Sequence, residues 1–270
     1  MLTKSISTAR SILKNEGVRQ VARVSLEKAG IWWRHGNPLE LGKLVGRPSP
    51  VARVDGCRFG LDAPIVTDDL RYLLLSGKHE KPERTLIRRY LDPELALIEL
   101  GGALGVVSCI ANRLLRHPER HVVVEANPAL VPLLVSNRSR NRCRFAVLNR
   151  AVAYRQRVAR FHVNANVLAS SVGVPDEHGV DVPATTLQQI LEQHDFGRCT
   201  LICDIEGAEV ELVRHESSVL SAHVKTLIME VHDRLVGPEV SNHMLQTLND
   251  VGFRVLDRAW DSFAFANTRF

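Results

Sequence analysis

The sequence contains no long apolar run. No stretch of about 18 consecutive apolar residues occurs in it, which argues against a membrane-spanning helix. Lys4, Arg10 and Lys14 also interrupt the region where a secretory signal peptide would need its apolar core. Five cysteines are present, and none forms a Cys-x-x-Cys pair. We therefore expect reduced and mostly structural cysteines in a cytoplasmic protein.

Several common functional motifs are missing as well. A dinucleotide fingerprint Gly-x-Gly-x-x-Gly that starts at Gly101 would need glycines where Ala103 and Val106 stand. Neither the phosphate-binding loop Gly-x-x-x-x-Gly-Lys-Ser/Thr nor the nucleophile elbow Gly-x-Ser-x-Gly occurs. A nucleotide-dependent oxidoreductase is therefore disfavoured and is kept only as an alternative.

Charge is distributed unevenly along the chain. Residues 1–47 carry nine Lys and Arg against three Glu, a net charge of +6, whereas the whole chain carries +5. The remainder is thus close to −1, and a general nucleic-acid-binding surface is not expected. Residues 3–15 and 18–30 have helical spacing of apolar residues, and Trp32 and Trp33 follow them. This basic segment is either a helical cap on the main domain or a peripheral contact with an anionic membrane.

The pattern divides the chain into an N-terminal helical extension with a connector, 1–77, and a main domain, 78–270. A short hairpin is expected near 51–61, within a stretch rich in proline and glycine. In the main domain, apolar runs alternate with helical patterns. The expected strands are 95–100, 121–125, 144–148, 200–203, 225–231, 253–258 and 262–268. The expected helices are 82–91, 104–115, 128–138, 186–194, 208–214 and 239–250.

This alternation predicts an α/β, Rossmann-like fold with a mostly parallel sheet covered on both faces. The last two strands differ from the others. Only Ala259, Trp260 and Asp261 separate them, and a connection this short requires an antiparallel pair. We therefore expect a seven-stranded sheet that ends in an antiparallel hairpin.

Three features meet at the carboxyl ends of the first strands, where open parallel sheets bind ligands. Gly101 and Gly105 allow a tight turn after the first strand of the sheet. Glu125 ends the second strand, where a carboxylate can accept hydrogen bonds from both hydroxyls of a ribose. Asn149 and Ala151 follow the third strand and flank the expected adenine. The sequence therefore predicts a pocket for an adenosine.

The spacing of the glycines indicates which cofactor carries this adenosine. Glu99, Gly101 and Gly105 form the pattern acidic-x-Gly-x-x-x-Gly, which is typical of enzymes that use S-adenosylmethionine. That cofactor has no pyrophosphate, so it needs no phosphate-binding loop. A carboxylate such as Glu99 can instead interact with its cationic amine. The alternative is a tight glycine turn in some other α/β fold.

Further motifs occur in the order of one known family. They are ELGGALG at 99–105, VVVEANP at 122–128, ASSVG at 169–173, VPATTL at 182–187, CDIEGAE at 203–209 and MEVH at 229–232. On these motifs, residues 78–250 resemble the FkbM-type family of S-adenosylmethionine-dependent methyltransferases. The resemblance implies a class I methyltransferase fold and O-methylation, in many relatives of a sugar hydroxyl on a glycan or natural product.

The resemblance also assigns cofactor-binding residues. Glu99, Gly101 and Gly105 match the family's cofactor loop, and Glu125 matches its ribose carboxylate. Glu80 resembles a glutamate in the approach to the first strand. The chain departs from the family at three places, because Glu99 replaces the usual Asp, Gly102-Ala103 replaces Ala-Asn, and Gln188 replaces an Asp.

The remaining motifs match the family's acidic signatures. Asp204, Glu206, Gly207 and Glu209 match Asp-x-Glu-Gly-x-Glu, and the residues from Glu230 to His232 match Glu-x-His. Each also has a structural interpretation as a turn residue, a helix cap or a buried polar partner.

An alcohol must lose its proton when it accepts a methyl group. Asp204, Glu206 and His232 are the candidate catalytic residues for this step, because they follow central strands near the expected methyl group. Asp204 is also a candidate cofactor ligand. Together with Glu230, these three residues offer ligands for Mg²⁺ or Mn²⁺, although we predict no metal.

We therefore expect an O-methyltransferase that uses S-adenosylmethionine and methylates a sugar hydroxyl. Its partners would be a small-molecule or glycan acceptor, without nucleic acid. Besides the oxidoreductase, the alternative is a non-catalytic scaffold that docks a glycan-assembly complex through residues 1–47. The sequence names neither the acceptor nor the oligomeric state.

Overall fold

The computed structural model describes residues 51–161 and 179–270. The N-terminal helical extension that we predict and the motif at 169–173 lie outside this range. The chain forms two compact units, Met1–His79 and Glu80–Phe270. Among the residues described, no helix is long and apolar enough to cross a membrane.

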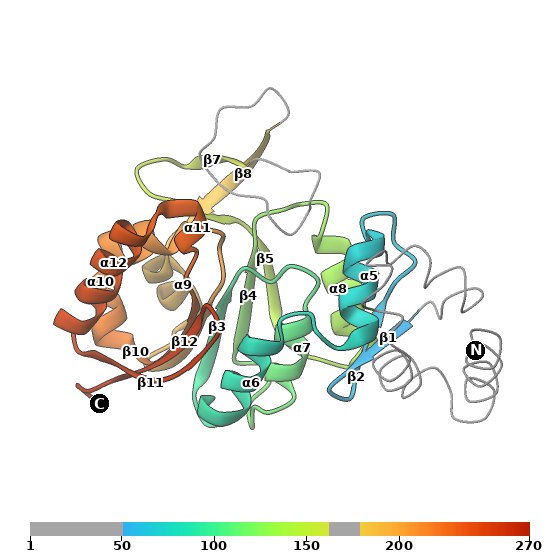
Figure 1. The fold of residues 1–270 in the computed structure, drawn as a ribbon, viewed down its shortest axis with the longest axis horizontal. Helices are drawn as coiled ribbons and strands as arrows, with labels where there is room; N and C mark the ends of the chain where they lie inside the picture. Colours follow the sequence, from blue (N-terminus) through green and yellow to red (C-terminus); the bar gives the residue numbers. More distant parts are fainter. Residues whose placement is uncertain (1–50, 162–178) are drawn as a thin grey trace, which may run out of the picture. The chain divides into compact units, whose positions relative to one another are not determined.

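The described part of the first unit is a hairpin followed by a helix (Figure 1). Strands β1 (Val51–Val54) and β2 (Cys57–Gly60) pair in antiparallel fashion, which confirms the hairpin predicted near 51–61. Helix α5 (Asp68–Ser76) is not among the predicted helices. The sequence does contain its signals, because the Thr67 hydroxyl accepts a hydrogen bond from the Leu70 N–H and Gly77 ends the helix in the left-handed conformation.

The second unit contains the predicted seven-stranded sheet. Its strands are β3 (Ala96–Leu100), β4 (His121–Glu125), β5 (Ala146–Asn149), β9 (Cys199–Cys203), β10 (Val224–Glu230), β11 (Phe253–Ala259) and β12 (Ser262–Asn267). They lie in the order β11-β12-β10-β9-β3-β4-β5. Every neighbouring pair among β10, β9, β3, β4 and β5 is parallel, whereas β12 is antiparallel to both of its neighbours. This is the sheet of a class I methyltransferase fold.

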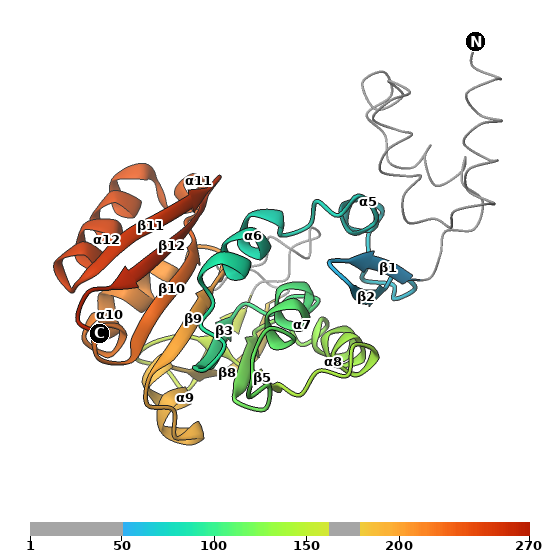
Figure 2. The same ribbon diagram turned by 90° about the horizontal axis from the view of Figure 1, so that it is seen from below.

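Helices cover both faces of this sheet (Figure 2). They are α6 (Lys81–Tyr90), α7 (Val106–Asn112), α8 (Val131–Arg140), α9 (Leu187–His194), α10 (Glu209–His223), α11 (Asp233–Val236) and α12 (Pro238–Asp250). On one face, Leu97 and Ile228 pack with Leu86 of α6 and Val107 of α7. The larger core on the other face joins the sheet to α9, α10 and α12. Because successive strand residues face opposite sides, the buried strands read as continuous apolar runs.

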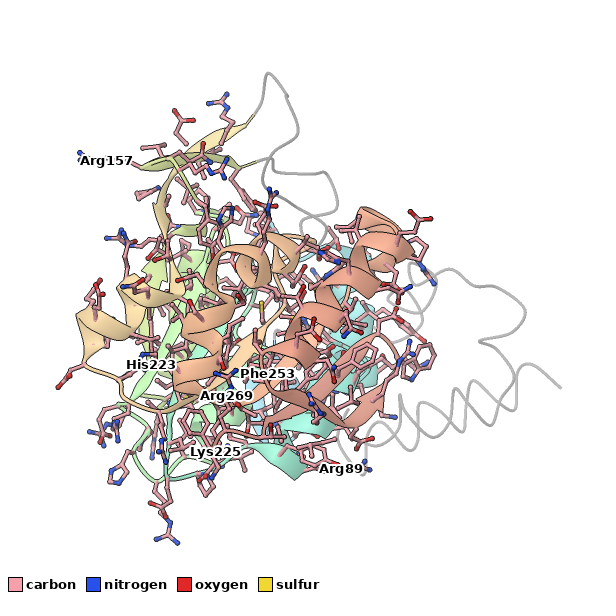
Figure 3. All side chains as sticks on the ribbon, turned by 90° about the vertical axis from the view of Figure 1, so that its left-hand side faces the viewer. Arg89, Arg157, His223, Lys225, Phe253 and Arg269 are labelled. Atoms are coloured by element: carbon pink, nitrogen blue, oxygen red, sulfur yellow. The ribbon has the colours of Figure 1, made fainter. Side chains whose placement is uncertain are left out.

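Two ion pairs lie at the surface of this unit, and Figure 3 labels their basic members, Arg89 and Lys225. Arg89 Nη1 of α6 lies 2.7 Å from Asp257 Oδ2 of β11. Lys225 Nζ of β10 lies 2.9 Å from Asp92 Oδ2. Both basic side chains are exposed, so solvent screening leaves each pair only a minor contribution to stability.

A small second sheet is absent from the predicted elements. Strands β6 (Ala151–Val152), β7 (Val158–Phe161) and β8 (Val180–Thr185) lie in the order β6-β8-β7. Val158 and Val180 are exposed, and β6 has only two residues, so no apolar run marks these strands in the sequence.

The predicted helix 208–214 is too short, because α10 continues to His223. The backbone of α10 leaves helical geometry at Glu216, which has φ −124° and ψ 24°. The buried Glu216 carboxylate accepts hydrogen bonds from the N–H groups of Leu187 and Gln188, each at 2.8 Å, and from the Tyr154 hydroxyl at 2.6 Å. Glu216 therefore caps the amino end of α9 from a kink in α10.

Replacing Glu216 by alanine is expected to lower the free energy of unfolding by about 3–5 kcal/mol. The substitution would leave the Tyr154 hydroxyl and the two amides of α9 without their acceptor. Denaturant unfolding followed by circular dichroism measures the change.

The matched control is Glu211→Ala on the same helix. Glu211 is half exposed and, among the residues that the structure describes, pairs with Arg214 and His215 on the surface, so its removal should cost about 1 kcal/mol or less. Equal losses for the two variants would contradict the capping role of Glu216.

Candidate functional site

The turn after β3 brings two strand ends into contact. The N–H groups of Gly101 and Gly102 donate to the carbonyl oxygen of Val124, and the Asp204 N–H donates to that of Leu100. Gly101 has φ +91°, and a Cβ atom placed on it would lie 1.7 Å from the Asp204 carbonyl oxygen. Only glycine fits this position, as its place in the predicted cofactor loop requires.

Gly105, which precedes α7, also combines a positive φ with a close approach of another element. It has φ +79°, and a Cβ atom there would lie 2.5 Å from Leu134 Cδ1 of α8. The Asn137 side-chain amide of α8 donates to the Leu104 carbonyl at 2.9 Å. Helix α8 thereby holds the glycine turn in place.

Glu125 lies at the end of β4, directly beside this turn. Its carboxylate is 6% exposed and accepts hydrogen bonds from the N–H groups of Ala103 and Asn127, both at 2.6 Å. Burial raises the pKa of Glu125 to about 7, against the lowering effect of these backbone hydrogen bonds. The carboxylate is thus held rigidly where ribose hydroxyls are expected, with acceptor lone pairs left over.

The two predicted adenine-flanking residues occupy different environments. The Asn149 side-chain amide donates to the carbonyl oxygens of Glu125 and Ala126, at 2.8 and 3.1 Å, and so ties the ends of β5 and β4 together. Ala151 is 1% exposed and packs with Ala159 and Phe161 in the small sheet. Asn149 therefore shapes the rim of the pocket, whereas the Ala151 side chain lies in a hydrophobic core.

Two more carboxylates face the glycine turn. Glu99 is 1% exposed, and Glu80 Oε2 accepts a hydrogen bond from the Val107 N–H at 3.3 Å. Burial raises the pKa of Glu99 well above its usual range, and the negative charges of Glu80 and Glu125 raise it further. A positively charged ligand would relieve this repulsion. The amine and sulfonium of S-adenosylmethionine fit that requirement.

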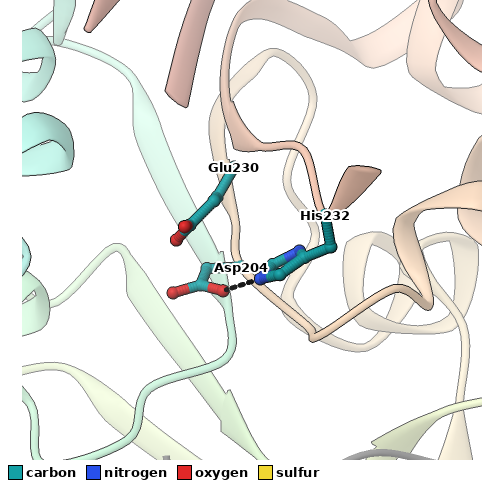
Figure 4. Close-up of side chains that lie close together, drawn as sticks. All are labelled: Asp204, Glu230 and His232. Carbon is teal, nitrogen blue, oxygen red and sulfur yellow. Dashed lines mark ion pairs between the residues drawn. The ribbon is translucent and has the colours of Figure 1, made fainter. Parts of the chain in front are cut away.

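The predicted catalytic residues converge at the ends of β9 and β10. We call Asp204, Glu206, Glu209, Glu230 and His232 the acid–histidine cluster. His232 Nε2 lies 3.5 Å from Asp204 Oδ1, as Figure 4 shows, and also 3.5 Å from Glu206 Oε2. Its Nδ1 lies 3.1 Å from Glu209 Oε1, without the alignment of a hydrogen bond.

Glu209 organises the loop that carries this cluster. Its carboxylate is buried and accepts hydrogen bonds from the N–H groups of Ile205 and Gly207, at 2.7 and 2.8 Å. These two bonds fix the turn between β9 and α10. Because the turn is fixed, the carboxylates of Asp204 and Glu206 stay close to the His232 ring.

The charges in the cluster shift one another's protonation. Burial raises the pKa of Glu230 to about 7, and the Glu83 charge adds to this shift. Burial also raises the pKa of Asp204, followed by the charges of Glu230 and Glu209. For His232, burial lowers the pKa, but the charges of Glu209, Glu206 and Glu230 together outweigh it and raise the value to about 9. His232 is therefore protonated near neutral pH, which favours the carboxylates over His232 as proton acceptors.

Glu83 is a site residue that no sequence motif singles out. It is 4% exposed on α6 and accepts a hydrogen bond from the Ser262 hydroxyl of β12. Its charge acts on both Asp204 and Glu230. In the sequence, the one feature that points to Glu83 as a site residue is its position one helical turn after Glu80.

Three members of the cluster have metal-ligand geometry. Asp204, Glu230 and His232 each offer one ligand atom, and these atoms lie within 4.8 Å of one another. Glu206, which the sequence also offers as a metal ligand, does not belong to this set. Oxygen donors with one imidazole suit Mg²⁺ or Mn²⁺.

Backbone strain also marks this region. Glu80, Ala103 and Glu206 are non-glycine residues with positive φ, at 49°, 41° and 53°. Each lies beside the glycine turn or within the acid–histidine cluster. Such conformations cost about 1–3 kcal/mol each and persist where the surroundings impose them, as at functional sites.

The strand order, the glycine turn after β3 and the acidic end of β4 together define a class I methyltransferase. The chain belongs to the FkbM methyltransferase family, because the family's model, "Methyltransferase FkbM domain", matches residues 99–255. Its methyl donor is S-adenosylmethionine. This membership confirms the family resemblance and rules against the oxidoreductase alternative.

Solved structures with a similar fold share little sequence with this chain. The ribosomal protein L11 methylase of Lactobacillus delbrueckii subsp. bulgaricus is 14% identical, with a TM-score of 0.41 over 68% of this chain and 75% of that one. The precorrin-6y C5,15-methyltransferase of Geobacter metallireducens GS-15 is 13% identical, with a TM-score of 0.42 over 77% and 93%.

A third structure, Aeropyrum pernix fibrillarin with natively bound S-adenosyl-L-methionine, is 13% identical, with a TM-score of 0.38 over 68% and 71%. At these scores we take nothing about the acceptor from any of the three. No curated protein matches the chain.

Proposed function

We propose that the protein transfers a methyl group from S-adenosylmethionine to an oxygen atom, namely a sugar hydroxyl of a glycan or glycosylated natural product. One observation carries this proposal. The glycine turn and the acid–histidine cluster adjoin, since Gly101 packs against the backbone of Asp204. The cofactor pocket and a set of proton acceptors therefore share one edge of the sheet.

The residues present suit an alcohol as the acceptor. S-adenosylmethionine supplies an electrophilic methyl group on a sulfonium. The protein must then orient a hydroxyl and accept its proton, and orientation provides much of the acceleration. The Asp204 side chain is 26% exposed, and its Oδ1 has no hydrogen-bond partner in the described structure, so this carboxylate can take that proton. Protonated His232, 3.5 Å away, stabilises the carboxylate.

Alternatively, the same residues could activate the acceptor hydroxyl by binding a divalent cation. The mutual approach of Asp204, Glu230 and His232 supports it. A bound Mg²⁺ or Mn²⁺ would orient the acceptor oxygen and lower the pKa of its hydroxyl. Activity before and after chelation with EDTA, with Mg²⁺ added back, decides between the two.

The proposed reaction is tested by supplying S-adenosylmethionine with a carbon-13 methyl group to the full chain, together with a panel of sugars and glycans. The expected product carries the label on a sugar oxygen, as its carbon-13 shift and mass fragments show. Label on nitrogen would contradict O-methylation. Binding of S-adenosylhomocysteine without transfer to any acceptor would favour the scaffold alternative.

Glu125→Gln is expected to weaken S-adenosylhomocysteine binding by at least about tenfold, because a neutral amide replaces the charged acceptor of two ribose hydroxyls. Glutamine is preferable to alanine here, since its amide oxygen still accepts from one of the two N–H groups, Ala103 or Asn127, whereas alanine would leave both without an acceptor. Isothermal titration calorimetry measures the affinity.

Glu192→Gln on the exposed face of α9 is the matched control and should bind like the wild type. Unchanged affinity in Glu125→Gln would refute the ribose assignment.

Peripheral membrane contact through residues 1–47 stays a prediction. The structure does not describe these residues, and their excess of positive charge is the basis for it.

A further inference from the structure

A buried polar chain runs behind the glycine turn. Ser108 Oγ of α7 donates to Glu99 Oε1 at 2.7 Å. The other carboxylate oxygen, Oε2, lies 3.4 Å from His121 Nε2 at the start of β4. Both side chains are at most 1% exposed, and neither Oε2 nor Nε2 has a hydrogen-bond partner in the described structure.

Asn112 fixes the protonation of His121. The Asn112 side-chain oxygen accepts from the Arg144 N–H at 3.0 Å, and its nitrogen donates to the Pro118 carbonyl at 2.7 Å. The amide orientation is thereby settled at both ends. Its second N–H then donates to His121 Nδ1, 3.2 Å away. His121 Nδ1 must carry a lone pair.

The neutral ring therefore bears its proton on Nε2, directed at Glu99. Burial lowers the pKa of His121 to about 3, so the ring stays neutral in the neutral pH range. Glu99 Oε1 thus accepts a hydrogen bond from the Ser108 hydroxyl, and the neutral His121 N–H group lies 3.4 Å from Oε2 without the alignment of a hydrogen bond. Burial is the largest effect on Glu99 and raises its pKa, the Ser108 hydrogen bond opposes it, and the charges of Glu80 and Glu125 raise the pKa further. The positive end of the His121 N–H dipole acts in the same direction as Ser108 and favours the ionised form.

We propose that His121, fixed as the Nε2–H tautomer by Asn112, is a positioning residue that holds Glu99 as the anion facing the amine of the methyl donor. This inference rests on the proposed role of Glu99 toward that amine. The Glu99 side chain extends from β3 to within 3.4 Å of His121 Nε2 on β4.

Two ligands isolate the amine contribution. S-adenosylhomocysteine carries the amine, whereas methylthioadenosine has the same nucleoside thioether without the amino acid. His121→Phe removes the N–H donor but keeps a planar ring next to Phe145. It is expected to weaken S-adenosylhomocysteine binding at least about tenfold, with methylthioadenosine binding unchanged. A merely structural role would weaken both ligands equally and overturn the inference.

Two further variants keep the test valid if His121→Phe does not fold. Asn112→Asp has the same shape, but its oxygens cannot donate to Nδ1, so the His121 proton should move to Nδ1. Nitrogen-15 NMR of the ring reads the tautomer directly, and S-adenosylhomocysteine affinity should fall as in His121→Phe. His121→Gln restores an N–H near the Nε2 position and should bind within about threefold of wild type.

The failures are distinguishable. A wild-type proton on Nδ1 refutes the tautomer assignment and the inference alone. A wild-type protein that binds neither ligand refutes the cofactor pocket itself. Glu125→Gln should weaken both ligands, because both contain the ribose.

Discussion

Gly101→Ala is expected to abolish S-adenosylhomocysteine binding and to lower the free energy of unfolding by about 3–5 kcal/mol. Two effects add. The backbone at Gly101 has φ +91°, which a side chain rarely adopts, and the new Cβ atom would lie 1.7 Å from the Asp204 carbonyl oxygen. A backbone atom cannot move aside as a flexible side chain can, so the ends of β3 and β9 must separate. Thermal unfolding and calorimetry measure the two losses.

The chain offers controls that separate these effects. Gly237 has φ +90°, and a Cβ atom placed on it would meet nothing within 4 Å. Gly237→Ala therefore adds the backbone strain without a clash and should cost about 1–2 kcal/mol. Gly197→Ala adds neither and should be nearly neutral. If Gly101→Ala were no worse than Gly237→Ala, the close approach of the two strand ends would be refuted.

Asp204→Asn is expected to lower kcat by about 100-fold to 10 000-fold, the range for loss of a general base. Asparagine has the same shape but cannot take the acceptor's proton. The fold should survive, because Asp204 Oδ1 makes no hydrogen bond in the described structure that the substitution would break. Initial rates at saturating cofactor measure the effect, and Asp250→Asn on the surface of α12 is the control.

The affinity for S-adenosylhomocysteine separates the two roles that we assign to Asp204. An unchanged affinity with a large loss in kcat supports the general base. A weaker affinity with kcat retained would instead make Asp204 a cofactor ligand. Loss of wild-type activity in EDTA, restored by Mg²⁺, would show that Asp204 acts as a metal ligand.

The sequence predicts the central sheet well for a physical reason. Strands buried on both faces are mostly apolar, so β3, β4, β9 and β10 stand out as nearly continuous apolar runs. The small sheet escapes prediction because Val158 and Val180 face solvent and β6 is very short. The full length of α10 is not predicted, because its kinked residue Glu216 is stabilised by hydrogen bonds from the N–H groups of Leu187 and Gln188, which lie far away in the sequence.

Some residues of the site can likewise be predicted from the sequence, and others cannot. Gly101, Glu125 and Asp204 follow or end strands, so counting along the chain places them at one edge of the sheet. Glu83 joins the acid–histidine cluster only because β12 inserts beside β10, which no local pattern reveals. The sequence gives His121 no role, yet it is the first residue of β4 and shares the face of Glu125. The two-residue alternation back from Glu125 is the signal that could find it.

The place of β12 constrains the order in which the sheet can close. Strand β10 has β9 on one side and β12 on the other, and β12 follows β11 along the chain. During synthesis from the amino end, β10 therefore keeps an open edge until β12 leaves the ribosome. An open edge is a template for pairing with other chains. A polypeptide cut short before Ser262 thus exposes a central strand to aggregation, and it loses the hydroxyl that binds Glu83.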